Sequence, residues 1–564
     1  MATHWRRVWL GLVALPVCVL AATPGARFDT DPDRLVYITA HWKDRAQLIR
    51  IAQQFQHLDV DERAHVARTE ASADDLRALR RARIRFEIDD AATQRMRDSE
   101  AKFAQDQLVA NAIPNFPCYR TVEETYATMD ALAALRPSIA TVRDIGPSWT
   151  WQKTGGAQGY RMRVLRLDNT AVTGTKASMV VLSAIHAREY TTAEVVTRFA
   201  EWLVRDYGTD PEATWLVDTF RFHFILQGNP DGRKKAESGL SWRKNTNTDN
   251  GVCSANNYGV DLNRNFPWQW AQTPGGSSSN PCASNYRGPS VTSEAETQNM
   301  LRYIVGTRGS TGTYSGGALP DFRTDTGAAP SDYRGMFLDI HSAARLVLWP
   351  WAWSNATAPN ATALRTLGRR LAYFNSYQPK QWIGLYPADG TNTDTVYGIT
   401  GAPSYTLELG QAFFETCTSF ESATYPRNLE ALKYAARNLW SPYNSPSGPE
   451  TTAIGLSAPS VQRGQPFAVS AWVDDGRFNQ TQGTEPVQNI ANVRAYVDAR
   501  PWTTGAAFIA MQATDGVFDS AREQATVNLP TAGLSTGRHV VFVRGTDASG
   551  RAGTPKALYF DVTD

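Results

Sequence analysis

An apolar run followed by a helical pattern marks the stretch around which the chain is organised. Met179–Ile185 is apolar except at Ser183, which predicts a buried β-strand. Beyond it, apolar residues recur at helical spacing as far as Leu203, with polar residues between them. His186 and Glu189 lie where the strand gives way to the helix. In open α/β sheets ligands bind at such places, outside the carboxyl ends of the strands.

Strand and helix patterns alternate from residue 115 to residue 440. Phe220–Leu226 and Gly335–Ile340 predict further strands, and Val122–Leu135 predicts a helix. The alternation predicts an α/β domain with a central mixed sheet flanked by helices. Compact domains rarely keep long Gly-, Ser- and Asn-rich loops unless the loops build a site, and this chain has three, at 244–258, 271–290 and 308–332.

A small α/β unit precedes this domain, between residues 28 and 95. Its elements run in the order strand, helix, strand, helix, strand, at Leu35–Ile38, Ala46–Phe55, His65–Thr69, Ser72–Arg81 and Ile84–Ile88. A polar, charge-rich stretch from Thr93 to Gln107 follows. Residues 96–114 are therefore expected to form a linker that proteases can reach.

The pattern changes again near the C-terminus. Residues 441–449 are rich in Ser, Pro and Gly, which predicts a linker. Beyond it, residues 450–564 contain short alternating runs separated by turn residues, at Phe467–Val473, Asn492–Val497, Gln524–Leu529 and His539–Arg544. This pattern predicts an antiparallel β-sandwich.

Composition and charge limit the classes of protein that are possible. The 564 residues carry a net charge of +2, which argues against a nucleic-acid binder driven by charge. Arg6 and Arg7 precede an apolar run that ends at Ala22, so residues 1–22 are expected to be a secretory signal peptide. No later stretch is long and apolar enough for a membrane span. We expect a secreted monomer, extracellular or periplasmic, that is not embedded in a membrane.

Four cysteines remain once the signal peptide is removed. An even number of cysteines in an exported protein favours disulfides, and four allow three pairings. Cys253 with Cys282 would close a local loop and is the favoured pair, which leaves Cys118 with Cys417. Buried free thiols are the alternative.

A zinc site is the first chemistry that the pattern suggests. His186 and Glu189 offer an imidazole nitrogen and a carboxylate oxygen, and a catalytic zinc needs a third protein ligand. His341 also ends a strand-like run, so it could reach the same edge of the sheet. Asp261 is placed to accept a hydrogen bond from a zinc-bound imidazole. Each residue read alone could also be purely structural.

Other charged residues suit hydrolysis of a substrate that carries a carboxylate. Glu408 lies among apolar residues of a predicted strand, where burial raises a carboxylate pKa as a general base requires. A buried ion pair is the alternative for Glu408. Arg243 could stabilise an oxyanion, and Asn263 with Arg264 could hold a carboxylate. Read singly, these charges also fit a solvated loop.

Seven motifs in order resemble the zinc metallocarboxypeptidases of the pancreatic carboxypeptidase, or funnelin, family. The resemblance covers about residues 115–440 and points to a secreted bacterial type with a C-terminal β-sandwich. The motifs are His186-Ala187-Arg188-Glu189, Asn229-Pro230-Asp231-Gly232, Trp242-Arg243-Lys244, Asp261-Leu262-Asn263-Arg264-Asn265-Phe266, Ile340-His341-Ser342, the segment Tyr386–Tyr397, and Thr406-Leu407-Glu408-Leu409.

The resemblance implies a role for each matched residue. His186, Glu189 and His341 would bind one Zn²⁺, and Glu408 would be the general base and acid. Arg243 would polarise the scissile carbonyl, and Asn263 with Arg264 would anchor the C-terminal carboxylate of the substrate. Tyr386 would cap the substrate, Arg188 would line an outer subsite, and Cys253 and Cys282 match a common family disulfide. The 28–95 unit resembles the family's inhibitory pro-domain, which would make the protein a zymogen.

Substrate choice depends on a position where the family's basic-specific members carry Asp and this chain carries Thr393. A neutral wall predicts release of neutral, mainly hydrophobic C-terminal residues, although Asp389 and Asp394 lie close by in the sequence. One alternative is a peptidase of the same fold that cuts cell-wall muropeptides or isopeptide bonds. Another is a non-catalytic module whose sandwich contacts a surface or a carbohydrate.

Overall fold

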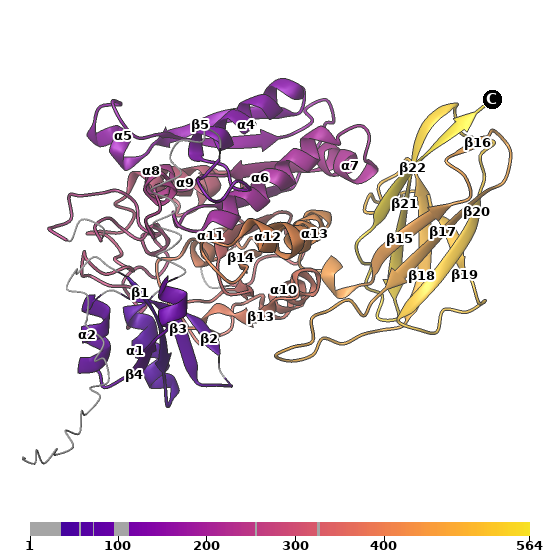
Figure 1. The fold of residues 1–564 in the computed structure, drawn as a ribbon. Coiled ribbons are helices and arrows are strands. Elements are labelled where there is room, and N and C mark those ends of the chain that lie inside the picture. Colours follow the sequence, from indigo (N-terminus) through magenta and orange to yellow (C-terminus); the bar gives the residue numbers. More distant parts are fainter. Residues whose placement is uncertain are drawn as a thin grey trace, which may run out of the picture.

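The computed structural model describes residues 35–55, 58–61, 63–71, 73–94, 112–253, 257–323 and 327–564. The expected signal peptide and most of the expected linker at 96–114 lie outside the described residues. The described part forms three units in chain order, each with its own sheet (Figure 1).

The central unit contains the mixed sheet that the sequence predicted. Its eight strands have the order β13-β12-β14-β11-β7-β8-β6-β5. The four strands β14, β11, β7 and β8 are parallel, whereas β12, β6 and β5 pair antiparallel with their inner neighbours. The strands are β5 Ala140–Pro147, β6 Arg161–Leu167, β7 Ser178–Ser183, β8 Arg221–Ile225, β11 Met336–Ser342, β12 Leu346–Trp349, β13 Gln378–Gln381 and β14 Ser404–Leu409.

Helices cover this sheet, and their positions follow from local signals. A capping box of Thr121 and Glu124 begins α4, and α6 begins directly after Glu189. Helix α6 packs against β7 and β11, and α11 packs against β11 and β14. The helices are α4 Val122–Leu135, α5 Trp149–Lys153, α6 Tyr190–Arg205, α7 Pro211–Thr219, α8 Pro230–Glu237, α9 Ala295–Ile304, α10 Ala361–Asn375, α11 Asn392–Thr400, α12 Cys417–Ser419 and α13 Tyr425–Arg437. No helix of the described residues is both long and apolar enough to cross a bilayer.

The N-terminal unit is a small antiparallel sheet with the strand order β2-β3-β1-β4 and two helices. Its elements are β1 Val36–His41, α1 Arg45–Gln54, β2 Asp59–Asp61, β3 Val66–Ala71, α2 Ala73–Arg81 and β4 Arg85–Ile88. The five predicted elements are present. The short strand β2 was not predicted, because three residues give no readable alternation.

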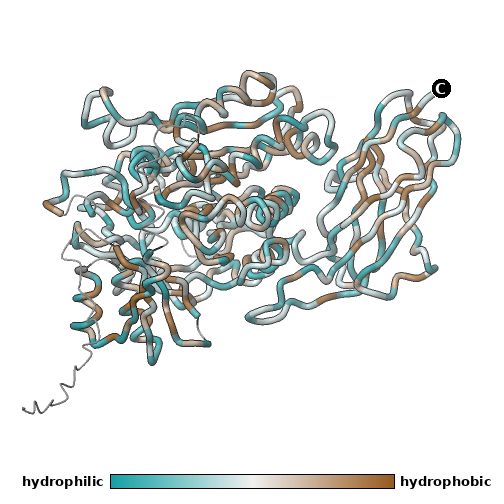
Figure 2. The backbone as a smooth tube through the Cα atoms, viewed as in Figure 1, coloured by the Kyte–Doolittle hydropathy of each residue, from teal (hydrophilic) through white to brown (hydrophobic). Residues whose placement is uncertain are grey.

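The C-terminal unit is antiparallel β structure, but its two expected layers form one curled sheet. Strand β19 pairs with both β18 and β20, which makes the order β15-β17-β20-β19-β18-β21-β22-β16 continuous. Only the short β16 pairs parallel, with β22. Figure 2 shows apolar and polar positions changing along these strands, and buried apolar residues of the strands form one hydrophobic cluster. The strands are β15 Glu450–Leu456, β16 Ser460–Gln462, β17 Phe467–Asp474, β18 Ile490–Val497, β19 Ile509–Ala513, β20 Arg522–Leu529, β21 Gly537–Asp547 and β22 Lys556–Thr563.

The segment at 441–449, expected as a linker, is packed against the central unit. Its short 3-10 helix η4 covers Ser445–Ser447. The buried Arg370 on α10 donates to the carbonyl oxygens of Pro446 and Gly448, at 2.9 and 2.8 Å. The central and C-terminal units are therefore in direct contact rather than joined by a free spacer.

Two disulfides hold loops of the central unit. Cys118 is bonded to Cys417, and Cys253 is bonded to Cys282. The first joins the segment before α4 to α12, and the second closes the loop between α8 and α9.

Candidate active site

The site forms where β7, β11 and β14 end side by side. His341 on β11 lies in register with Glu408 on β14, so both side chains leave the same end of the sheet. His186 and Glu189 follow β7, the other neighbour of β11, and precede α6. All three strands are buried along their whole length. Apolar strands in the middle of a parallel sheet thus bring distant residues together.

His186, Glu189 and His341 converge on one point. Glu189 Oε1 lies 2.7 Å from His186 Nδ1, and Glu189 Oε2 lies 3.1 Å from His341 Nδ1. The two Nδ1 atoms are 3.0 Å apart. The three residues are buried, and their ligand atoms could hold one metal ion.

The other nitrogen of each imidazole faces a carboxylate. His186 Nε2 lies 3.2 Å from Asp261 Oδ1, and His341 Nε2 lies 2.5 Å from Asp339 Oδ2. Asp261 was expected in this role, whereas Asp339 was not identified from the sequence. Its signal was its place two residues before His341, which puts both side chains on the same face of β11.

The donor set and the charge of the site both fit Zn²⁺. Two imidazoles and one carboxylate are a ligand set of catalytic zinc sites that leave a fourth position open. Burial would raise the pKa of Glu189, but the facing His186 and His341 hold it well below its usual range. Asp261 and Asp339 add negative charge in the same buried region, and buried charge of one sign requires a counter-charge. Arg243 offsets part of this charge, and a divalent cation held by the three ligands would supply the rest.

Arg243 and Glu408 lie beside these ligands. Arg243 donates to Asp261 Oδ2 from Nη2 at 2.8 Å and from Nε at 3.2 Å, and its Nη1 is 3.8 Å from Glu189 Oε1. Burial raises the pKa of Glu408 to about 8, with His341 and Arg243 acting against this and Glu189 adding to it. Among the described groups, Glu408 Oε2 has no hydrogen-bond partner.

Asn263 and Arg264 lie on the short 3-10 helix η1, Leu262–Arg264, which Asp261 caps. Asn263 Oδ1 accepts from the backbone N–H of Asn392 at 2.9 Å, which connects η1 to the start of α11. Arg264 is almost completely buried, and its Nη1 donates to the Asn263 carbonyl at 2.6 Å. Arg243, Arg264 and Asn263 thus lie next to the residues that could bind the metal.

Comparison with known proteins agrees with this geometry. The family model for zinc carboxypeptidases matches residues 125–420, which is more than half of the 564-residue chain. The chain belongs to the zinc carboxypeptidase family. The matched segment contains all three zinc ligands, so the zinc site of His186, Glu189 and His341 is the site typical of this family.

Several relatives of the zinc carboxypeptidase family are similar along part of their length. Carboxypeptidase A1 of Bos taurus is 28% identical over 337 residues, which is 58% of this chain and 71% of that protein. Carboxypeptidase A2 of Mus musculus is 29% identical over 303 residues, 52% of this chain and 63% of that protein. A zinc carboxypeptidase of Saccharothrix mutabilis subsp. capreolus is 28% identical over 373 residues, 64% of this chain and 77% of that protein.

Solved structures of zinc carboxypeptidases have a similar fold. Carboxypeptidase A from Helicoverpa armigera superposes with a TM-score of 0.57 at 21% identity, over 72% of this chain and 98% of that one. At this identity the likeness describes the fold alone.

Two acids lie close to Thr393 in the sequence, Asp389 and Asp394, and both accept hydrogen bonds from other described residues. Thr393 Oγ1 lies 2.8 Å from Thr406 Oγ1. Burial raises the pKa of the Asp394 carboxyl to about 7, although the backbone N–H groups of Ala352 and Trp353 donate to it and act against this rise. The buried Asp389 accepts the backbone N–H of Thr273 at 2.9 Å and the Ser277 hydroxyl at 2.5 Å. The carboxylates of Asp389 and Asp394 therefore already accept hydrogen bonds from other groups of the protein.

Two predicted site residues, Arg188 and Tyr386, lie on the side of the N-terminal unit. Arg188 Nη1 lies 3.0 Å from Glu70 Oε2 on β3, and Ser241 Oγ donates to the same oxygen at 2.6 Å. Tyr386 belongs to a hydrophobic cluster shared with the N-terminal unit, and burial raises its pKa to about 12. The N-terminal unit therefore lies against the rim of the zinc site.

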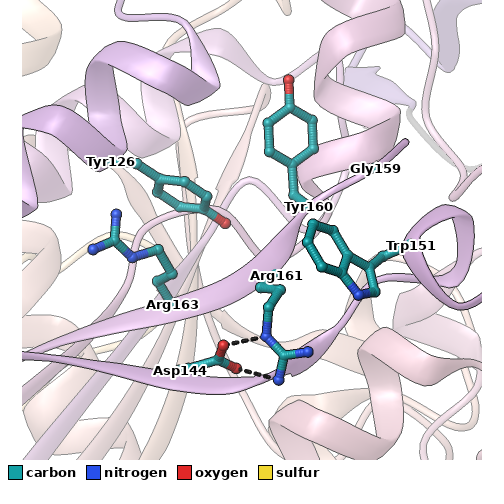
Figure 3. Close-up of a pocket in the computed structure, with 7 residues that line it drawn as sticks. All are labelled: Tyr126, Asp144, Trp151, Gly159, Tyr160, Arg161 and Arg163. Atoms are coloured by element: carbon teal, nitrogen blue, oxygen red, sulfur yellow. Dashed lines mark hydrogen bonds and ion pairs between the residues drawn. The ribbon is translucent and has the colours of Figure 1, made fainter. Parts of the chain in front are cut away.

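A separate hollow of about 360 Å³ lies on the side of α4, β5 and β6. Figure 3 shows its arginines, and Arg161 and Arg163 are both paired with acids, Asp144 and Asp130. None of the predicted site residues lines this hollow, which is lined by Tyr126, Asp144, Trp151, Gly159, Tyr160, Arg161 and Arg163.

Proposed function

We propose that this chain is a zinc-dependent exopeptidase that removes the C-terminal residue of peptides and proteins. The observation that carries the proposal is the convergence of His186, Glu189 and His341 beside the buried Glu408 and Arg243. Zinc held by the three ligands supplies Lewis-acid chemistry, which polarises the scissile carbonyl and lowers the pKa of a water molecule.

Glu408 moves the proton in this proposal. Its raised pKa lets it accept a proton from the attacking water and later return it to the leaving amine at near-neutral pH. Arg243 donates to the oxyanion that develops on the carbonyl oxygen. Asp261 keeps the Arg243 guanidinium in place through its two hydrogen bonds.

Asn263 and Arg264 restrict cleavage to the end of the substrate. A planar guanidinium next to an amide suits the capture of a free α-carboxylate. The hydrogen bond of Asn263 to Asn392 connects this anchor to α11, the helix that carries Thr393. The side chain of the last substrate residue would thus lie against α11, with Tyr386 capping it.

We propose a preference for neutral, mainly hydrophobic C-terminal residues. The occupied carboxylates of Asp389 and Asp394 support a wall at Thr393 without a free negative charge. Peptides that differ only in the last residue, compared by kcat/KM, test the proposal. Phe, Leu, Tyr and Met ends should be faster than Arg, Lys, Asp and Glu ends, and a clear preference for Arg or Lys would contradict it.

A matched pair of variants sharpens this test. Thr393→Asp places a charge at the wall and should move the preference toward Arg and Lys ends. Thr393→Val keeps the size and removes the hydroxyl, and it should keep the neutral preference. Muropeptide and isopeptide substrates belong in the same series, because cleavage of these in place of ordinary peptides would favour the alternative peptidase of the same fold.

We also propose that the N-terminal unit is an inhibitory pro-segment. The contacts of Glu70 with Arg188 and Ser241, and the hydrophobic cluster shared with Tyr386, support a unit that blocks the approach to the zinc site. Limited proteolysis between Thr93 and Gln107 should raise activity. Glu70→Ala should raise the activity of the uncut protein, whereas Glu87→Ala, an exposed acid on β4, should not. Equal rates before and after cleavage would contradict the proposal.

The proposed location is outside the cytosol. Two disulfides within one chain favour an oxidising compartment. A reducing and non-reducing peptide map of the exported protein tests both pairs.

A further inference from the structure

Asp339 is a buried carboxylate that the proposed chemistry does not use. It lies in the middle of β11, between Leu182 of β7 and Thr406 of β14 in register, and has no exposed surface. A charge in such a strand is costly unless it is paired or functional. Among the described residues, the hydrogen bond of Asp339 is to His341, and its Oδ1 atom has no partner.

The contact fixes which nitrogen of His341 is available. A carboxylate only accepts hydrogen bonds, so the 2.5 Å contact with Asp339 Oδ2 places the ring proton on His341 Nε2. Asn263 Nδ2 lies 3.3 Å from the same nitrogen, which is farther than the Asp339 oxygen. The Asn263 amide is held in this orientation because its Oδ1 accepts the backbone N–H of Asn392. In the neutral imidazole, Nδ1 then carries the lone pair, and this atom faces Glu189 and His186.

His186 shows the same arrangement. Its Nε2 faces Asp261 and its Nδ1 faces Glu189. The two zinc-binding imidazoles are therefore held as a pair, each with a carboxylate behind it. Asp261 also accepts hydrogen bonds from Arg243 and from the backbone N–H of Asn263 at the start of η1. Asp339 has no such second hydrogen bond among the described residues.

We propose that Asp339 is a positioning residue that holds His341 as the Nε2–H tautomer, so that His341 presents Nδ1 to zinc. The inference rests on the proposed zinc site. It assigns Asp339 to metal affinity rather than to substrate binding or proton transfer. Carboxylates behind zinc-bound histidines commonly affect metal affinity by about 10–100-fold.

The test is the zinc affinity of Asp339→Asn, measured by competition with a chelator of known affinity. Asn keeps the size and removes the charge, and the affinity should fall about 10–100-fold. Asp339→Ala should lose at least as much. Glu296→Gln is the matched control, because Glu296 is an equally buried carboxylate whose hydrogen bonds go to Trp149 and Asn245. It should bind zinc like the unaltered protein.

Thermal unfolding separates positioning from a general structural role. With zinc removed by EDTA, the Tm of Asp339→Asn should stay near that of the unaltered protein, and the increase in Tm on adding zinc should be smaller. A structural role alone would lower both Tm values equally and leave the zinc affinity unchanged. An affinity within twofold of the unaltered protein would overturn the inference.

A second measurement needs no variant. Nitrogen-15 NMR of labelled histidine in the zinc-loaded protein should show His341 with its proton on Nε2, and a proton on Nδ1 would overturn the inference. Zinc binding and peptide hydrolysis of the unaltered protein are measured alongside. If both are normal while Asp339→Asn binds zinc normally, only the inference on Asp339 fails. If the unaltered protein binds no zinc, the proposed function fails with it.

Discussion

At the scale of single residues, Glu408 is the group whose surroundings bear most directly on turnover. It is buried at the end of β14, and burial raises its pKa to about 8. Glu408→Gln keeps the size and removes the ability to take a proton. We expect kcat to fall about 10²–10⁴-fold, with zinc content unchanged by atomic absorption.

Glu415→Gln is the matched control for this prediction. Glu415 is also a buried acid after β14, but its Oε1 accepts from Ser419 and Thr424 rather than facing the zinc ligands. Activity of this variant should stay near normal. Comparable activity in Glu408→Gln would remove Glu408 from the mechanism.

Glu296 gives a prediction on stability and pH. Burial raises its pKa to about 8, from about 4.3 in an unfolded chain. Between these values the folded chain keeps a proton that the unfolded chain has lost, so the free energy of unfolding falls as pH rises through this window. Glu296→Gln should remove this slope. Its free energy of unfolding, compared with that of the unaltered protein, should rise by up to roughly 4 kcal/mol between pH 4 and pH 8. Tm measured across this range checks it, and an unchanged slope would contradict it.

The zinc ligands could be predicted from sequence because they lie at or just beyond the ends of apolar strands, and parallel strands end at one edge. The role of Asp339 could not be predicted, because the sequence shows only an acid within an apolar strand and does not show which group it bonds to. Its partner is fixed by the face of β11 on which both side chains lie. Contacts with the N-terminal unit, such as that of Glu70 with Arg188, depend on how two units dock, which periodicity does not encode.

At the scale of elements, the loop between α8 and α9 is held by a buried lysine. Lys244 Nζ donates to the carbonyl oxygens of Asn257, Pro281 and Ala283, at 2.6, 2.9 and 3.1 Å. The Cys253–Cys282 disulfide closes the same loop. These contacts hold the backbone next to Arg243 in place.

Lys244→Met should therefore destabilise the central unit. The side chain keeps its length but leaves three carbonyl groups without their donor, at a cost of about 1–3 kcal/mol. Calorimetry should show a lower Tm. Lys153→Met is the control, because Lys153 forms an exposed ion pair with Asp249 and such pairs contribute little. Equal Tm values for the two variants would contradict the role of Lys244.

The elements with a clear apolar pattern could be predicted, and two departures from the predictions have physical reasons. Strand β2 is too short to show alternation. Residues 441–449 have the composition of a linker, yet Arg370 binds their carbonyl groups. Composition reports the local preference of the backbone and cannot report a partner that lies on another helix.

At the scale of the whole molecule, the C-terminal sheet lies beside the central unit (Figure 1) and packs against it through α7. Arg437 on α13 bonds to Glu212 of α7 and to Glu450 of β15, all buried. Aromatic rings continue the contact: Trp502 is stacked on Trp440, with 5.9 Å between ring centres, and lies tilted against Trp215 at 5.5 Å. The curl of this sheet could not be read from the sequence, because alternation is the same in a sandwich and in a curled sheet.

Removing residues 450–564 should therefore harm the central unit. It exposes the aromatic contact and removes Glu450 from the buried Arg437, which keeps Glu212 as its partner. Without truncation, Arg437→Met takes the buried arginine from both Glu212 and Glu450, at a cost of about 3–5 kcal/mol, and should lower Tm. Arg463→Met, at an exposed pair with Asp564, should not. A truncated chain with unchanged Tm and solubility would show that the sheet is a separate attachment.

The most direct test of the exopeptidase proposal is product analysis by mass spectrometry. The zinc-loaded, trimmed protein is given two peptides that end in Phe, one with a free carboxylate and one amidated. We expect stepwise loss of single residues from the free acid only, at least about 100-fold faster than any loss from the amide, because the amide leaves the buried Arg264 without its charge partner. His341→Ala should cleave neither peptide. Equal cleavage of both peptides, or internal cleavage of either, would contradict the proposal.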